Sequence, residues 1–154
     1  MKIEDLDGFI ALCQQKVDAL KVSFPEIDSI VAQHLVVLIA GVYEETIEES
    51  IRARAEKSKD IALVNLVTSL VDETFRNPDS KNVKRLIKRF GKAAVDELSG
   101  KVKLEDAEAL NSIILNKNAI AHGKDSPVTI KDVENYYAKS RVVIHAVNEI
   151  VRGG

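Results

Sequence analysis

The sequence predicts an all-α protein that forms one domain over residues 1–154. Apolar residues recur at intervals of three and four along nearly the whole chain, which is the spacing of amphipathic helices. The chain has only 7 glycines and 3 prolines, and no segment shows the two-residue alternation of a β-strand. Its 154 residues, 45% hydrophobic and 30% charged, have the composition of a single globular domain. We therefore expect a bundle of about six to seven helices without a β-sheet.

The apolar pattern sets the order of the predicted helices. Residues 3–22 form the first helix, which ends at Ser23-Phe24-Pro25, and residues 27–56 form a second helix about 45 Å long. The other predicted helices cover residues ~60–76, ~80–90, ~92–99, ~103–122 and ~129–151.

Residues that favour helix ends separate these segments. Asn77-Pro78-Asp79-Ser80 ends the third helix and starts the fourth, because proline is tolerated only in the first turn of a helix. Gly91 and Gly123 are placed as helix C-caps. Thr129, followed by Asp132 three residues later, resembles a capping box that opens the last helix.

The cysteine content and the N-terminal sequence indicate the cellular compartment. The single cysteine, Cys13, excludes an intrachain disulfide and a cysteine-based zinc site. Glu4 and Asp5 stand where a signal peptide needs basic and then apolar residues. The longest apolar run, Leu35–Tyr43, has nine residues, about half a membrane span. We expect a soluble, cytoplasmic protein with no membrane partner.

That apolar run also indicates where the core lies. We expect residues 35–42 to be buried in the second helix. His34 lies on the same apolar stripe and is predicted to be a core histidine with its polar atoms satisfied.

One predicted helix is strongly basic. Residues 81–92 contain six cations and no acid, so the net charge of −2 leaves −8 on the rest of the chain. At 100° per residue the six side chains fall within an arc of about 140°. They are Lys81, Lys84, Arg85, Lys88, Arg89 and Lys92. A phosphate backbone is one partner that would use this surface, and a solvated face that pairs with acidic helices is the alternative.

A second group of polar residues lies near the end of the predicted helix 103–122. Lys117 is in the middle of an apolar arc, where an ammonium is costly unless it finds an anion or an interface. Glu44 directly follows the apolar run and is the anion we expect it to pair with.

His122 lies about 140° from Lys117 around the same helix. It is stacked with Asn118 at i, i+4 and is roughly in line with Asn111. An imidazole, an amide and a nearby cation suit phosphoryl chemistry, because histidine transfers protons near neutral pH and the cation stabilises developing charge. A histidine that favours the dipole at a helix C-terminus is the alternative interpretation.

Asn118-Ala119-Ile120-Ala121-His122-Gly123 resembles the Arg-Asn-x-x-x-His signature of HEPN domains, in particular their RiboL-PSP-HEPN or MAE_28990-type branch. The resemblance covers about residues 30–147 in the correct order. Three further segments carry it: residues 41–47 of the long helix, Asn77-Pro78 with residues 83–91, and residues 128–133.

The resemblance implies an α-helical bundle that pairs as a homodimer and, in many members, a metal-independent endoribonuclease without cofactors. Others of the family only bind RNA or nucleotides. By the same resemblance, residues from both protomers form a composite site, and here these are Lys117, Asn118 and His122, with Glu44 and Asn111 in support. Lys117 replaces the signature arginine, which keeps the charge but loses the planar fork that binds phosphate in a bidentate manner.

The sequence thus favours a ribonuclease of a toxin or anti-phage system, with RNA as its partner along the basic helix. The alternative is a non-catalytic RNA-binding or protein-interaction module that regulates a defence or toxin–antitoxin system, with an antitoxin or another regulatory protein as a further partner. A purely structural helical dimer is the third interpretation.

Overall fold

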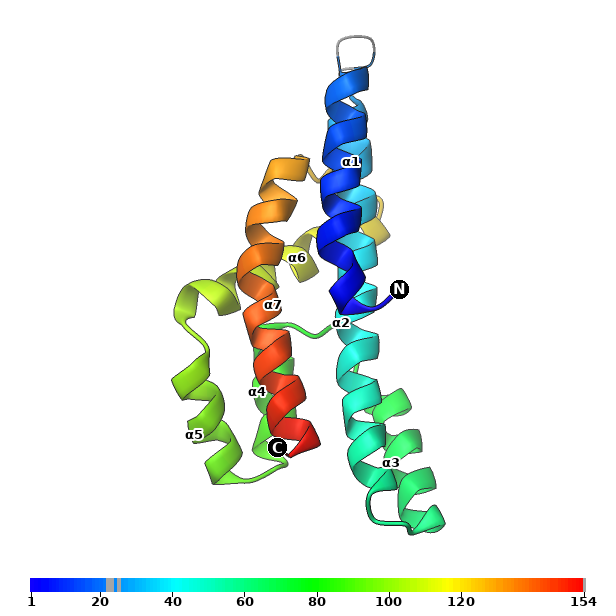
Figure 1. Cartoon of the computed structure of the whole chain (residues 1–154), viewed down its shortest axis with the longest axis vertical. Helices are drawn as coiled ribbons and strands as arrows, with labels where there is room; N and C mark the ends of the chain where they lie inside the picture. The colour runs from blue at the N-terminus through cyan, green and yellow to red at the C-terminus, as the bar shows by residue number, and fades with distance from the viewer. Residues whose placement is uncertain (22–23, 25, 154) are drawn as a thin grey trace.

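In the computed structural model the chain folds into seven α-helices preceded by a short 3-10 helix, η1 (Ile3–Asp5) (Figure 1). The structure describes residues 1–21, 24 and 26–153. No strand occurs in these residues, so the all-α prediction is confirmed. The helices are α1 (Leu6–Leu20), α2 (Ile27–Glu56), α3 (Ile61–Thr74), α4 (Ser80–Lys88), α5 (Lys92–Lys101), α6 (Leu104–Ala121) and α7 (Ile130–Arg152).

The helix boundaries agree with the sequence pattern to within a few residues. Residues 3–5 form a 3-10 turn rather than the start of α1, and α4 ends at Lys88, two residues before the predicted end. The prediction of Gly91 as a C-cap is wrong: Arg89 caps α4, and Gly91 is the N-cap of α5, so Lys92 of the basic segment lies on α5. The Thr129–Asp132 capping box is present at the start of α7. The break predicted at 23–25 includes Ser23 and Pro25, which lie outside the described residues.

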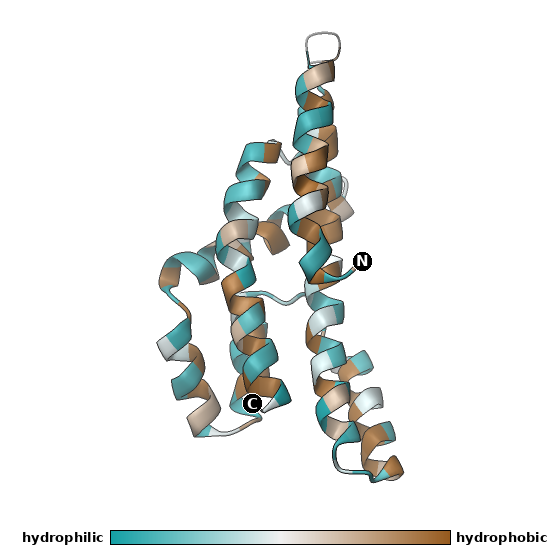
Figure 2. Ribbon diagram, viewed as in Figure 1, coloured by the Kyte–Doolittle hydropathy of each residue, from teal (hydrophilic) through white to brown (hydrophobic). Residues whose placement is uncertain are grey.

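The long helix α2 is the centre of the bundle, with α1, α3, α6 and α7 packed along it (Figure 1). By length and composition alone α2 could also cross a membrane, but here its apolar residues form much of the core (Figure 2). The helix α7 packs on α2, α5 and α6, and α4 touches α5, α6 and α7. In contrast, α3 packs only on α2 among the described elements.

Of the two expectations for α2, the burial of residues 35–42 is wrong in part and the burial of His34 is wrong. Residues 35–42 are mostly buried, but Val37 is 42% exposed and Gly41 is also on the surface. His34 is exposed and is not a core histidine. The reason is that Ile30, which is 61% exposed, His34 and Val37 share one outward side of α2, so apolar residues continue around the helix beyond its packed face.

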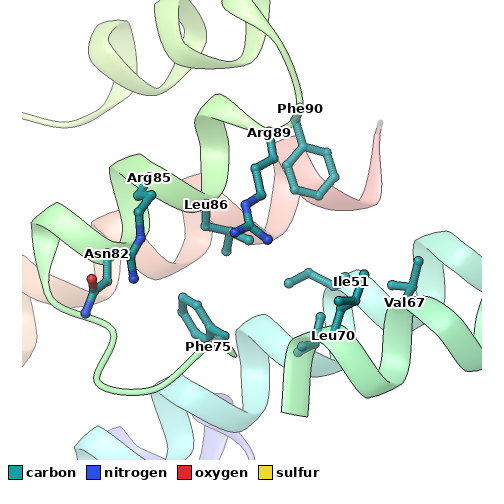
Figure 3. Close-up of a pocket in the computed structure, with 10 residues that line it drawn as sticks. Ile51, Val67, Leu70, Phe75, Asn82, Arg85, Leu86, Arg89 and Phe90 are labelled. Atoms are coloured by element: carbon teal, nitrogen blue, oxygen red, sulfur yellow. The ribbon is translucent and has the colours of Figure 1, made fainter. Parts of the chain in front are cut away.

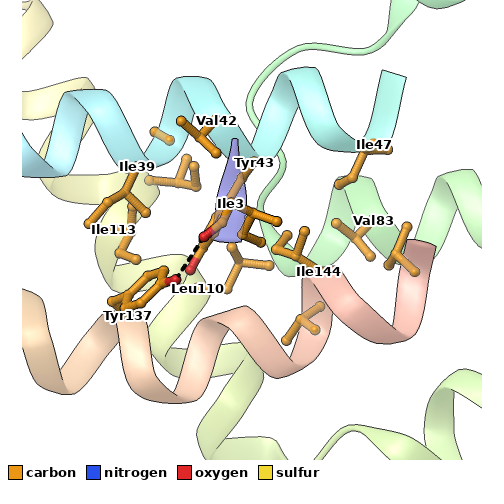
Figure 4. Close-up of a cluster of buried hydrophobic side chains, with 14 of the residues drawn as sticks. Ile3, Ile39, Val42, Tyr43, Ile47, Val83, Leu110, Ile113, Tyr137 and Ile144 are labelled. Carbon is orange, nitrogen blue, oxygen red and sulfur yellow. Dashed lines mark hydrogen bonds between the residues drawn. The ribbon is translucent and has the colours of Figure 1, made fainter. Parts of the chain in front are cut away.

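A small polar cluster lies in the centre of the core (Figure 4). The hydroxyls of Tyr43 and Ser140 are hydrogen-bonded at 2.8 Å, and the hydroxyl of Tyr137 donates to the carbonyl of Ile3 at 3.2 Å. Tyr43 and Ser140 have no exposed surface, and burial raises the pKa of Tyr43 far above its usual value. This cluster joins α2, α7 and the N-terminal turn by bonds that are satisfied only in one register.

We expect Ser140→Ala to lower the free energy of unfolding by about 1–3 kcal/mol, because it leaves the buried Tyr43 hydroxyl without its partner. Tyr43→Phe should lower the free energy of unfolding by about 1 kcal/mol, and the double variant should lower it by less than the sum of the two single losses. Urea denaturation of the four proteins measures this coupling. Tyr136→Phe is the matched control, and additive effects of Tyr43→Phe and Ser140→Ala would contradict the prediction.

Candidate functional site: the 77–80 turn and helices α4 and α6

The turn between α3 and α4 is held in one conformation by side chains on either side of it. Asn77 has a φ of 54°, in the left-handed region that asparagine tolerates better than most residues. The side-chain amide of Asn82 donates to the Asn77 carbonyl at 2.9 Å. Asp79 caps α4 by accepting from the backbone N–H of Asn82 at 2.7 Å. Asn82 therefore fixes the turn from the α4 side.

Helix α6 holds the same turn from the opposite side. The Asn111 side-chain oxygen accepts from the backbone N–H of Ser80 at 2.9 Å. Two turns further along α6, Lys117 Nζ donates to Asn77 Oδ1 at 2.6 Å. Two of the predicted site residues, Asn111 and Lys117, are thus brought to one structural element, which the sequence had marked as a helix break and as part of the family resemblance.

The predicted ion pair between Lys117 and Glu44 is wrong. No carboxylate in the described part of the chain forms an ion pair with Lys117. Glu44 lies one turn before Glu48, which pairs with Arg52 at 3.2 Å. Burial raises the pKa of Glu48, Arg52 opposes this increase and Glu44 adds to it. Lys117 meets the turn instead, because Asn77 presents an oxygen to the half-buried side of α6.

The partner of Lys117 is a neutral amide, and this matters for its chemistry. An amide oxygen fixes the position of the ammonium but does not cancel its charge. An ammonium has three donors, and the bond to Asn77 uses one of them. Lys117 is therefore positioned and still able to attract an anion.

Asn118 and His122 lie elsewhere on α6. His122 is the C-cap residue of the helix, its side chain is exposed, and Gly123 follows it with a φ of 64°. The helix places His122 about 140° from Lys117, so one copy of the chain does not direct both groups to one point. Among the described residues no side-chain hydrogen bond connects Lys117, Asn118 and His122. His122 thus also matches the capping interpretation.

The face of α6 that carries His122 is incompletely covered. Leu115 lies on it, two helical turns before His122, and is 69% exposed. Asn118 is half-buried between the two along the helix. A single exposed leucine is common on a protein surface, and here it marks the side of α6 on which His122 lies.

The six cations of the basic helix are all exposed, at Lys81, Lys84, Arg85, Lys88, Arg89 and Lys92. None of them has an ion-pair partner within the described ranges, so the alternative of pairing with acidic helices is not what the structure has. Val83 and Ile87 are buried on the opposite side of α4, as the pattern predicts. The basic helix starts at the turn that Lys117 contacts.

Sequence reasoning missed Asn77 as a member of this site. Its one signal is an asparagine before a proline, which indicates a turn but not the residue that it contacts. In the residues that the structure describes, no group of three or more His, Cys, Asp or Glu side chains is placed to hold a metal ion.

The chain is thus an all-helical bundle in which an Asn-x-x-x-His element ends α6. The chain belongs to the RiboL-PSP-HEPN family, which it matches over residues 3–152. Neither the curated proteins nor the solved structures gave a significant match.

We expect Asn77→Gly to lower the free energy of unfolding by about 1–2 kcal/mol, because the Lys117 ammonium loses its acceptor and glycine costs backbone entropy. Glycine keeps the positive φ of this position, so the variant avoids backbone strain. Measured by urea denaturation, the loss should be smaller in a Lys117→Met background. An equal loss in both backgrounds would show that the bond contributes nothing.

Proposed function

We propose that this HEPN domain is an RNA-binding ribonuclease whose active site forms from two copies of the chain. The observation that carries the proposal is the state of Lys117, an ammonium held by a neutral amide of the turn before residues 81–92. The six cations of that segment, on α4, its C-cap and the start of α5, are exposed and unpaired. This arrangement provides a fixed positive charge next to a surface that can follow a phosphate backbone. The family resemblance supports a role in a toxin or anti-phage system.

In the proposed reaction the 2′-hydroxyl oxygen of RNA attacks the adjacent phosphorus, and the bond from phosphorus to the 5′-oxygen breaks. His122 accepts the proton of the 2′-hydroxyl or supplies the proton that the leaving 5′-oxygen takes up. Lys117 stabilises the charge that develops on the phosphorane oxygens, and Asn118 orients His122 or the phosphate. These roles require no metal from the protein.

A homodimer explains how groups on two sides of one helix can act together. A twofold contact on the face of α6 that carries Leu115 would bring His122 of each copy towards the other copy. Each cleft would then contain residues of both protomers, as the resemblance implies.

We expect the chain to be a dimer in solution, with about twice the 17.0 kDa mass of one copy. Leu115→Glu should give a monomer, because it places a charge in the contact. Light scattering after size exclusion measures both masses. Leu104→Glu, at an exposed leucine at the other end of α6, is the control. A monomeric wild type, or a dimer unaffected by Leu115→Glu, would contradict this arrangement.

With total RNA and EDTA, the wild-type protein is expected to cleave. His122→Ala should abolish cleavage and leave RNA affinity nearly unchanged, because the imidazole acts in the transition state. Lys117→Arg should keep or raise the activity, since it supplies the bidentate donor of the family signature. Gel electrophoresis and filter binding measure the two properties.

The alternative function is a non-catalytic RNA-binding or protein-interaction module, and the observation that favours it is lysine at the position of the signature arginine. Unchanged RNA binding without cleavage in both the wild type and Lys117→Arg would establish this alternative over the nuclease.

The salt dependence of RNA binding tests the basic helix. Replacing Lys84, Lys88 and Lys92 by glutamate should weaken binding to all sequences and flatten the slope of log affinity against log salt by about 0.7 for each lost contact. The matched control replaces Lys16, Lys59 and Lys131, which are exposed elsewhere on the chain. If both triple variants behave alike, net charge rather than the basic segment 81–92 determines the affinity.

A further inference from the structure

A groove lies between α3 and α4, with α2 as its floor (Figure 3). It encloses about 510 Å³, within the usual range of ligand sites. Ile51 of α2 lies at the floor, Val67 and Leu70 line the α3 side, and Leu86 and Phe90 line the α4 side. No backbone contact joins α3 to α4 in the described part of the chain, so the groove separates two elements that each pack elsewhere.

The α3 wall is entirely apolar or neutral. Residues 61–71 contain no charged side chain. Leu63 is 41% exposed and Leu66 is 56% exposed, so the apolar surface continues along α3 beyond the groove itself. The helix has 14 residues, about 21 Å at 1.5 Å per residue. This surface is therefore elongated, and a helix-sized occupant covers it better than a small ligand does.

The α4 wall is cationic. Arg85 and Arg89 are one helical turn apart, line the groove and point into it (Figure 3). Both are exposed, and neither has an ion-pair partner in the residues described. The occupant therefore needs an apolar side towards α3 and anionic groups towards α4.

We propose that this groove binds an acidic amphipathic helix of a partner protein. Apolar residues at i, i+3, i+4 and i+7 of that helix would pack on α2 and α3, and glutamate or aspartate at its edge would pair with Arg85 and Arg89. Helices that pack in this way lie about 8–10 Å from their neighbours, so the partner becomes an additional helix of the bundle.

The charges and the shape favour this occupant over RNA and over a second copy. The apolar α3 wall offers nothing to a phosphate backbone. Of the two phenylalanines that line the groove, Phe75 is only 6% exposed, and Phe90 is half-buried with the Arg54 guanidinium over its ring at 5.6 Å, which leaves little surface for a base to stack on. In a second copy, the exposed face of α3 has a single acid, Glu73, two turns after Leu66, because Asp72 is paired with Arg52, so this face does not neutralise both Arg85 and Arg89. The proposal does not depend on RNA cleavage, because it uses neither Lys117 nor His122.

The probe is a fluorescein-labelled 18-residue peptide of leucine, alanine and glutamate with an amphipathic pattern, and anisotropy measures its affinity for the full chain. One comparison peptide has lysine for every glutamate, and another has the same composition with the leucines scattered around the helix. We expect the acidic amphipathic peptide to bind at least about tenfold more tightly than either, because only it matches both walls.

Two double variants separate the groove from general charge attraction. Arg85→Glu with Arg89→Glu should lower the affinity for the acidic peptide by about tenfold or more, because both charge-assisted contacts are lost. Lys84→Glu with Lys88→Glu makes the same charge change at the same spacing on α4 and should have less than about a threefold effect. Leu66→Gln should weaken binding of the acidic peptide without altering the charge of the protein.

The proposal would be overturned if the two double variants lost the same affinity for the acidic peptide, or if the wild-type protein bound the acidic and lysine peptides equally. It would also be overturned if the arginine variant lost RNA affinity and not peptide affinity, or if Leu66→Gln changed only the mass of the protein in solution. Those two outcomes would assign the groove to RNA and to a second copy. Circular dichroism and melting of each variant establish that the chain remains folded.

Discussion

The placement of Lys117 on the inner side of α6 determines how this end of the bundle is built. An ammonium among apolar neighbours is unfavourable unless a polar atom meets it, and the turn between α3 and α4 provides that atom in Asn77. The turn is in its place because Asn82 and Asn111 satisfy its backbone groups from α4 and α6. The start of the basic helix and the position of Lys117 are therefore fixed by one set of hydrogen bonds.

The distribution of charge explains why these cations remain available. Some basic residues elsewhere are paired with acids on neighbouring elements: Lys101 with Glu149, Lys139 with Glu105 and Arg141 with Asp7. Each such pair is exposed and contributes little stability, but it reduces the charge around it. In residues 81–92, on α4 and the start of α5, the described structure has six cations, no acid and no such pairs, so the positive charge of an acidic protein is most concentrated there.

The fold could be predicted from the sequence because helical periodicity and helix-end residues act over a few residues. The site was only partly predictable. The bond between Lys117 and Asn77 joins residues 40 positions apart, and no local pattern encodes which oxygen an ammonium will meet. Glu44 was predicted to be the ion-pair partner of Lys117 because of its charge and its position after an apolar run. His34 was predicted to lie in the core because the exposed side of α2 is apolar as well as the packed side.

The basic helix has two separable sides. Lys84 and Lys88 precede Arg85 and Arg89 by one residue each, which rotates the two pairs by about 100° around the helix axis. The arginine pair lines the groove beside α3, whereas Lys84 lines a second hollow towards α5 and α6. A planar guanidinium binds carboxylate and phosphate alike in a bidentate manner, so position on the helix, and not residue type, separates the two surfaces. One short helix can thus present its lysines to RNA while Arg85 and Arg89 face a protein partner in the groove.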